Sequence, residues 1–423
     1  MANKLWNKDF LLLWQGQFVS QLGSQAFAIA MMFWVKHTTG SATLMGTLMM
    51  VSMLPSVLVS PFAGTFSDHY SRKKIIVYCD FISGILVLAL SYLIFFYDNE
   101  VTLIITILFG VSVVLGIIRT FFSPAITASI PDIVPQQRVE AANSLNQSSM
   151  QLSMLVGQAI GGILFVKLGA AVLFLIDGIS YVFSGVSEMF IKIPQKFPDK
   201  SAILKSKWNQ FKEDTLEGFH FVWKDKGMRF LFGAAAMLNF FSMPFIVLLP
   251  FYVEDFLKVQ ADWYGYILAG FGFGSLIGYA LAGTLKFPPG VKPKVAVLSL
   301  VLMAAIMPVF GFVLNHVFAL LLIMALGIFN GYFNITVITA LQTKVASEIR
   351  GRVFGLLTML TTGLMPISMG LSGVVADLMD QNIPLLFIIT GLITFILAIL
   401  ISGNKDMRDF LTPALTSESG DEE

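Results

Sequence analysis

The chain of 423 residues has little charge and a single cysteine. Charged residues make up 13% of it and apolar residues 56%, and the mean hydropathy is +0.79. A water-soluble domain of this composition would expose much hydrophobic surface, so we expect a protein solvated by lipid. With Cys79 alone no intramolecular disulfide can form, which excludes a fold held together by disulfides.

Patterns typical of enzymes and pumps are also missing. No Gly-xxxx-Gly-Lys-Ser/Thr loop is present, so an ATP-driven pump is disfavoured. No Ser-His-Asp set, metal-ligand cluster or paired carboxylates occur at a plausible spacing, so we expect neither catalysis nor a metal or cofactor. The 27 Lys and Arg against 26 Asp and Glu leave a net charge of +1, which gives no sign of a nucleic-acid partner.

Long apolar runs are abundant. A bilayer core of about 30 Å requires roughly 20 apolar residues in a helix. The sequence supplies about twelve such runs, so we expect an all-α integral membrane fold with twelve transmembrane helices. Their approximate spans are 10–35, 42–66, 74–97, 101–123, 141–167, 170–191, 229–253, 263–286, 294–314, 317–341, 352–376 and 383–402.

The positions of Lys and Arg predict the orientation. Loops that stay in the cytoplasm are enriched in these residues. With both termini inside, the outer loops keep only Lys36, Lys167 and Lys258. The charged N-terminal segment runs into the first apolar stretch without an Ala-x-Ala-like cleavage site, so we interpret it as the start of a spanning helix. We expect a multi-pass protein of a bacterial inner (plasma) membrane.

The chain divides near its middle into two related halves. Ala63-Gly64-Thr65 recurs as Ala282-Gly283-Thr284, and the segment around Arg138 recurs around Arg350. Such echoes favour a duplicated bundle. We expect a six-helix bundle over 1–193, a cytoplasmic linker with an amphipathic helix over 194–228, a second six-helix bundle over 229–403 and a cytoplasmic tail over 404–423.

One loop carries a recognisable gating motif. Gly64, Asp68, Arg72 and Lys73 form a Gly, three residues, an Asp and then a basic cluster. This resembles the signature loop of the major facilitator superfamily, and the resemblance extends in hydropathy and repeat structure over essentially the whole chain. It implies a latch in which Asp68, held by Arg72, accepts hydrogen bonds from the start of helix 11. The alternative is a tight turn with positive-inside lysines.

A second motif lies in the fifth predicted helix. Ser153, Gly157, Gln158, Gly161 and Gly162 resemble the antiporter motif of drug exporters in this superfamily, with Gln158 in place of its Pro and Ser153 in place of its first Gly. Small residues four apart make a smooth surface on which another helix can slide. Generic close packing of helices remains the alternative.

Short patterns indicate a branch of the superfamily. Phe10 to Gln17, Thr39-Gly40-Ser41 and Ser123-Pro124-Ala125 are similar to the macrolide-efflux branch, which also includes enterobactin exporters. The resemblance implies export of a small amphipathic compound, a macrolide-like drug or a siderophore, by proton antiport and alternating access. No cofactor is implied beyond the proton gradient, and we expect a monomer.

Few charges lie inside the apolar runs, which makes each a candidate for proton coupling. The candidates are Asp177, Asp80 and Arg119. Pairing with neighbouring side chains is the alternative for the two acids. Glu188 is followed by Lys192 four residues later, so we interpret these two as an interfacial ion pair.

Polar side chains on predicted helices 1, 7 and 10 are candidates for lining a substrate cavity, which the family places between helices 1, 4, 7 and 10. Those of helix 1 share one face. Interhelical hydrogen bonds are the alternative. The candidates are Gln17, Gln21, Ser24, Gln25, Asn239, Asn330 and Asn334.

Two other functions stay open at this point. The first is a lipid, lysolipid or nutrient transporter of the same fold, and the second is a membrane sensor that does not transport. The sequence does not distinguish either of these functions from that of an exporter.

Overall fold

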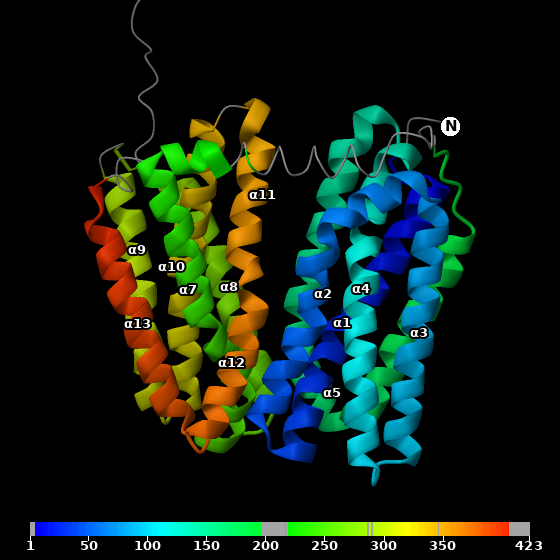
Figure 1. The fold of residues 1–423 in the computed structure, drawn as a ribbon, viewed down its shortest axis with the longest axis horizontal. Coiled ribbons are helices and arrows are strands. Elements are labelled where there is room, and N and C mark those ends of the chain that lie inside the picture. The colour runs from blue at the N-terminus through cyan, green and yellow to red at the C-terminus, as the bar shows by residue number, and fades with distance from the viewer. Residues whose placement is uncertain are drawn as a thin grey trace, which may run out of the picture. The chain divides into compact units, whose positions relative to one another are not determined.

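The structure is a computed structural model that describes residues 5–195, 216, 219–285, 287–288, 291–345 and 347–405. Helices form all of its regular secondary structure over these residues (Figure 1). The long helices are α1 (Lys8–Thr39), α2 (Ala42–His69), α3 (Arg72–Phe96), α4 (Val101–Ile133), α5 (Val139–Met189), α7 (Lys226–Phe251), α8 (Asp262–Thr284), α9 (Lys292–Val309), α10 (His316–Lys344), α11 (Ser347–Gly363), α12 (Met365–Leu378) and α13 (Ile383–Gly403).

Eleven helical segments of the described chain are long and apolar enough to cross a membrane. One of them, Gln136–Met189, has 54 residues and would measure about 80 Å as a straight helix, far more than one crossing needs. It bends at Gly169, where φ is 75° and ψ is 170°, a conformation that only glycine adopts readily. It therefore makes two crossings, which confirms the predicted break between 141–167 and 170–191 and brings the total to twelve.

A second break was not expected from the sequence. The predicted helix 352–376 is divided into α11 and α12 at Leu364, two residues before Pro366. A proline near a helix start lacks the amide that would continue the preceding helix, so Pro366 explains the interruption. The two pieces still make one crossing, Val353–Leu378.

The connection between α1 and α2 is short because both helices are capped within it. Gly40 ends α1 with a left-handed φ of 65°, and its amide donates to the Lys36 carbonyl. Ser41 then begins α2, and its side chain accepts a hydrogen bond from the Leu44 amide. This tight turn fixes the place of Lys36 and His37 close to the first residues of α2.

The chain forms two compact units. The first holds residues 1–211, 247–269 and 366–381, and the second holds 212–246, 270–365 and 382–423. Most of the predicted amphipathic linker, residues 196–215, and the tail from 406 onward lie outside the described residues. The division into bundles at 1–193 and 229–403 stays a prediction.

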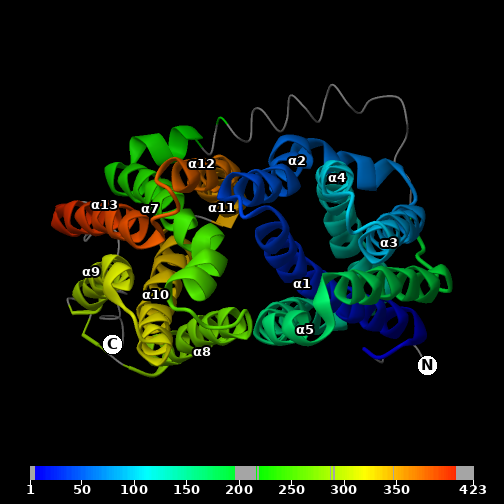
Figure 2. The same cartoon turned by 90° about the horizontal axis from the view of Figure 1, so that it is seen from below.

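Within the first unit, α5 contacts both α1 and α3 (Figure 2). Apolar side chains such as Phe10, Ile76 and Ile130 pack into a buried cluster near the start of α1. In the second unit a comparable cluster includes Phe232 and Leu300. Lipid is as apolar as these side chains, so close packing contributes more to helix association here than removal of apolar surface from water.

Candidate functional site

Three carboxylic acids are buried inside membrane-crossing segments of the first unit. Asp80 lies on α3, and Asp177 and Glu188 lie on the second crossing of α5; each is 1% exposed. In the part of the chain that the structure describes, none of them forms an ion pair, and each has one oxygen without a hydrogen-bond partner. We call these three residues the interior acids. Because a buried carboxylate without a cation is costly, they are suited to binding protons.

Asp177 faces the polar side of α1. Its Oδ1 atom lies 3.4 Å from the Ser24 Oγ atom and 3.4 Å from the Ser180 Oγ atom, while Oδ2 has no partner. Ser24 also lies 2.9 Å from the Tyr181 hydroxyl. Gly23 allows this close approach, because a Cβ atom at that position would lie 2.7 Å from the Asp177 carboxylate. The site thus connects a titratable group on α5 directly to α1.

Asp80 lies against the end of α5, where a Cβ atom at Gly185 would be 3.4 Å from the Asp80 Cβ atom, and its carboxyl group interacts with that of Glu188. The Gln17 side chain of α1 donates to Glu188 Oε1 at 2.8 Å, and the Ser184 hydroxyl lies 3.4 Å from the same atom. The second oxygens, Asp80 Oδ2 and Glu188 Oε2, have no hydrogen-bond partner. Two adjacent acids in a medium of low polarity cannot both ionise at moderate cost.

The predicted ion pair between Glu188 and Lys192 is wrong. Helix α5 ends at Met189, so Lys192 lies beyond the helix and the two residues do not share a helical face. Lys192 is exposed, and its amide donates to Asp9. Glu188 was missed as an interior acid because the sequence does not show that its side chain points toward α1.

Arg119, the third candidate for proton coupling, is exposed on α4. Its positive charge acts on the Tyr181 hydroxyl, but over the described ranges it forms no ion pair with Asp80 or Asp177. The structure therefore brings Asp80 and Asp177 into one polar region with α1 and leaves Arg119 at its edge.

The polar face of α1 is largely turned toward α5. Gln17 binds Glu188, Ser24 contacts Asp177 and Tyr181, and Gln25 packs against Gly157. For Gln17 and Ser24 the structure thus shows interhelical hydrogen bonds, the alternative that the sequence left open. Gln21 is half-buried with its carbonyl oxygen unpartnered, and cavity lining stays a prediction for it.

Three cavity candidates belong to the second unit. The Asn239 amide donates to the Ala235 carbonyl of its own helix, and the Asn330 amide lies 3.5 Å from Met303 Sδ. Asn334 is exposed one turn further along α10. A role in substrate binding stays a prediction for all three asparagines.

The antiporter-like motif forms close contacts on two sides. Gly157 and Gly161 pack against Gln25 and Ile29 of α1. On the other side Gly162 faces the chain at the start of α8, where a Cβ atom would lie 2.6 Å from the Ala261 carbonyl. The serine at the head of the motif, Ser153, is buried without a hydrogen-bond partner. Small residues are therefore needed on both faces of this helix.

The gating loop is described only in part. The Arg72 guanidinium lies 2.6 Å from Asp132 of α4 and donates to the Ala128 carbonyl at 2.8 Å. The sequence did not predict Asp132 as a partner. Lys73 is half-buried, whereas the surroundings of Gly64 and of the Asp68 side chain lie outside what the structure describes, so the latch stays a prediction.

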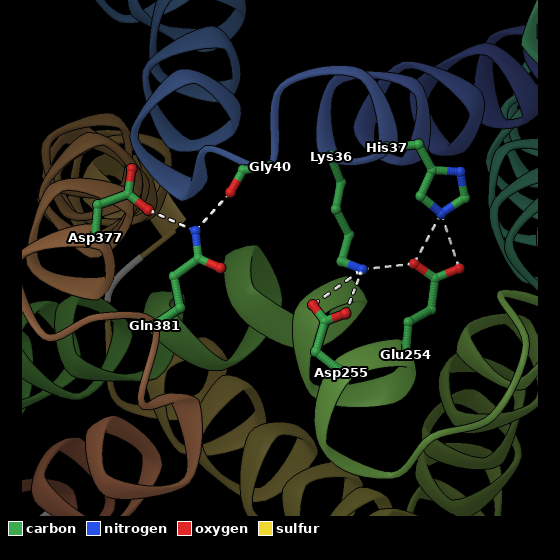
Figure 3. A network of polar contacts seen from close by, with 7 residues as sticks. All are labelled: Lys36, His37, Gly40, Glu254, Asp255, Asp377 and Gln381. Atoms are coloured by element: carbon green, nitrogen blue, oxygen red, sulfur yellow. Dashed lines mark hydrogen bonds and ion pairs between the residues drawn. The ribbon is translucent and has the colours of Figure 1, made fainter.

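A network of polar contacts joins helix ends in the first unit (Figure 3). Lys36, near the end of α1, lies 2.6 Å from Glu254 and 3.0 Å from Asp255, and His37 lies 2.8 Å from Glu254. Both acids belong to a single π-helical turn, Tyr252–Phe256, which follows α7. Such turns are rare and frequent at functional sites.

Asp377, near the end of α12, forms the second part of this network. Its carboxylate accepts hydrogen bonds from the amides of Ala42 and Thr43 at 3.1 and 2.8 Å and from the Ser41 hydroxyl at 2.8 Å. Gln381 donates to both Asp377 and the Gly40 carbonyl. Asp377 thereby caps the N-terminus of α2, where the helix dipole is positive. We call these residues, together with Lys36, His37, Glu254 and Asp255, the helix-end network.

An open cavity of about 750 Å³ lies beside the ionic part of the helix-end network. Charged groups of both signs line it, together with the Trp263 ring. The lining residues are Lys36, His37, Glu254, Asp255, Lys258, Val259, Gln260, Asp262 and Trp263.

Apolar membrane-length helices with acids buried inside them, as the described part of the chain shows, define a multi-pass membrane protein of the transporter class. The family model described as Major Facilitator Superfamily matches residues 13–369, and the chain belongs to this superfamily. The recognition from sequence and the predicted fold class are thus confirmed.

The chain is similar to named efflux proteins. It is 26% identical over 409 residues to Macrolide efflux protein A of Streptococcus pyogenes, which covers 95% of this chain and 97% of the relative. It is 24% identical over 385 residues to Multidrug efflux pump Tap of Mycobacterium tuberculosis, covering 89% of each. The crystal structure of nucleoside transporter NupG has a TM-score of 0.70 at 14% identity over 93% of this chain and 98% of that one, and shows the same fold.

Proposed function

We propose that the protein exports a small amphipathic compound, of the macrolide-like or siderophore class, by proton antiport. The similarity to proteins named for macrolide and multidrug efflux supports the direction and the substrate class. Polar but uncharged side chains at Asn239, Asn330 and Asn334, with Phe240 and Phe241 close by in the sequence, suit an amphipathic ligand better than an ion.

The observation that carries the proposal is the burial of Asp177 against α1. A proton bound there neutralises a carboxylate that has no cation beside it. Any movement of α1 that alters the Ser24 contact changes the free energy of holding that proton. Binding on one side of the membrane and release on the other would then supply the driving force for export.

Alternating access requires a seal that opens and closes on each side. The positive-inside pattern supports a protein of the bacterial plasma membrane with both termini inside, in which the helix-end network would lie at the outer face. The ion pairs of Lys36 and the cap provided by Asp377 would then form the outer seal. Gly64, Asp68, Arg72 and Lys73 would form the inner one. We propose that the two halves, 1–193 and 229–403, move against each other in a monomer.

The test is transport by purified protein in liposomes of known orientation. A proton gradient should drive accumulation of erythromycin, used as a macrolide probe, in wild-type vesicles and not in vesicles with Asp177→Asn. Substrate binding without a gradient should be retained by the variant, because Asp177 is not placed in the ligand site.

Two results would contradict the proposal. Full proton-driven accumulation by the Asp177→Asn variant would show that Asp177 does not couple proton movement to export. Movement of a lysolipid or a nucleoside, with no movement of erythromycin or of a catecholate siderophore, would replace the proposed substrate class.

A further inference from the structure

We propose that Asp80 and Glu188 together form a second proton-binding site, in which the two carboxyls share one proton. The hydrogen bond from Gln17 to Glu188 connects this site to α1. The site's ability to bind a proton is independent of transport. Its part in coupling rests on the proposed antiport function and deepens it. Glu188 belongs to no sequence motif described above, and the structure alone brings it to Asp80.

The position of the pair argues for a bound proton. Each side chain is 1% exposed, and each has one oxygen that meets no donor. Over the described residues no lysine, arginine or histidine forms an ion pair with either of them. Two unpaired negative charges side by side in the bilayer would repel each other without compensation. One shared proton removes the repulsion and supplies a donor between the two groups.

The surroundings favour a single shared proton. Two neutral donors serve the pair. Gln17 donates to Glu188 Oε1, and the Ser184 hydroxyl lies between the two acids, 3.4 Å from Glu188 Oε1 and bonded also to Asp80. These donors stabilise one negative charge on the pair. A second negative charge is not stabilised in the same way, since Asp80 Oδ2 and Glu188 Oε2 have no donor. The proton belongs to the pair, because strongly interacting carboxyls titrate as one unit.

The other titratable groups around the pair do not replace the proton. Cys79 precedes Asp80 on α3, and its thiol is at most a weak donor. Asp177 lies three turns before Glu188 on α5 and adds negative charge, so it increases the need for a proton. Tyr181 faces Asp177 and Ser24 from the same helix. Arg119 of α4 acts on Tyr181 and forms no ion pair with the described acids.

Gln17 links the pair to α1. Its amide is the only described side chain of α1 that donates to either carboxyl, at 2.8 Å. If α1 moves away, the negative charge on Glu188 loses its best donor and the pair should hold its proton more tightly. The reverse movement should favour release. A movement of α1 would then change proton binding at two positions along α5, at the pair and at Asp177.

Infrared spectroscopy tests the site without transport. The full-length protein in liposomes is titrated with pH, and the C=O stretching band of protonated carboxyls is followed for wild type, Asp80→Asn, Glu188→Gln and the double variant. Each single variant should keep the one carboxylic-acid equivalent of the wild type, because the acid that remains is still buried without a cation, and the double variant should lose that one equivalent. The loss in the double variant should not be the sum of two losses.

Two further variants act as controls. Asp177→Asn should remove a different band and leave that of the pair in place. Glu188→Asp keeps both carboxyls, so it should retain the band, and loss of the band in this variant would indicate a change of fold. Gln17→Leu should shift the titration of the pair to higher pH, because the ionised form loses a donor.

The outcomes separate this inference from the proposed function. Additive loss of two bands in the double variant, or no loss in any variant, would overturn the shared proton. Proton-driven transport that fails in Asp177→Asn, with the pair's band absent from the start, would support the proposed function and refute the second site. If the band of the pair is present in a protein that transports nothing, the second site is supported and the proposed function is refuted.

Discussion

Two groups of acids in the first unit have opposite surroundings. The interior acids have no cation beside them, and each keeps an oxygen without a partner. In the helix-end network every acid has a positive partner: Glu254 and Asp255 face Lys36, and Asp377 faces the N-terminus of α2. Both groups are linked to the same chain segment, α1 and the start of α2.

The difference indicates two roles for a carboxyl group in one protein. Next to a cation or helix N-terminus a carboxylate is stable when ionised and holds two elements together. Without one, in lipid, it is stable when protonated and is therefore able to carry a proton. Replacing each acid by its amide distinguishes these roles, because an amide resembles the protonated acid in shape and lacks the charge of the ionised one.

The largest expected effect is in the ionic part of the helix-end network. The double variant Glu254→Gln with Asp255→Asn leaves Lys36, 7% exposed, without a carboxylate. We expect a loss of about 3 kcal/mol, the cost of an unpaired buried charge. Thermal unfolding in detergent measures it. The matched interior variant Glu188→Gln should unfold at or near the wild-type temperature, and an equal loss in both variants would end the contrast between the two groups.

A smaller effect is expected where α5 meets the start of α8. Gly162→Leu places a side chain against the Ala261 carbonyl, which a Cβ atom alone would approach to 2.6 Å. Overpacking of this kind costs about 1–3 kcal/mol. Gly110→Leu is the control, because a Cβ atom there meets nothing within 4 Å. Equal unfolding temperatures for the two variants would show that the antiporter-like motif is not a close contact.

The smallest effect is expected at the cap of α2. Asp377→Ala removes the acceptor of the Ala42 and Thr43 amides and should cost about 1 kcal/mol. It should also raise the labelling rate of a thiol introduced at Ser41. Asp380→Asn is the control, because Asp380 is exposed and Asn tolerates its positive φ of 50°. An unchanged labelling rate in Asp377→Ala would show that the Asp377 cap is not part of the proposed outer seal.

Much of the fold was predictable because lipid imposes a length on each apolar run. The break between the runs 141–167 and 170–191 was predicted, and the structure places it at Gly169, whereas the division of α11 and α12 was not predicted. Pro366 stands inside an apolar run, and a proline there is compatible with either a kink or a break.

The sequence predicted residues of the candidate site only where a single acid lies within an apolar run. Asp80 and Asp177 are acids within apolar runs, and the sequence indicates them directly. Glu188 looked like the partner of Lys192, since sequence spacing does not show where the helix ends. The contact between Lys36 and Glu254 joins positions 218 residues apart, and no periodicity in one sequence gives the register between distant helices.

The central claim, that an interior acid carries the transported proton, is tested most directly by proton release. Purified protein in weakly buffered detergent solution is mixed with erythromycin, and the change in pH is measured. Wild type should release protons as substrate binds, and Asp177→Asn should bind erythromycin with a smaller release. Equal release by both proteins, or binding by wild type with no release at all, would contradict the account.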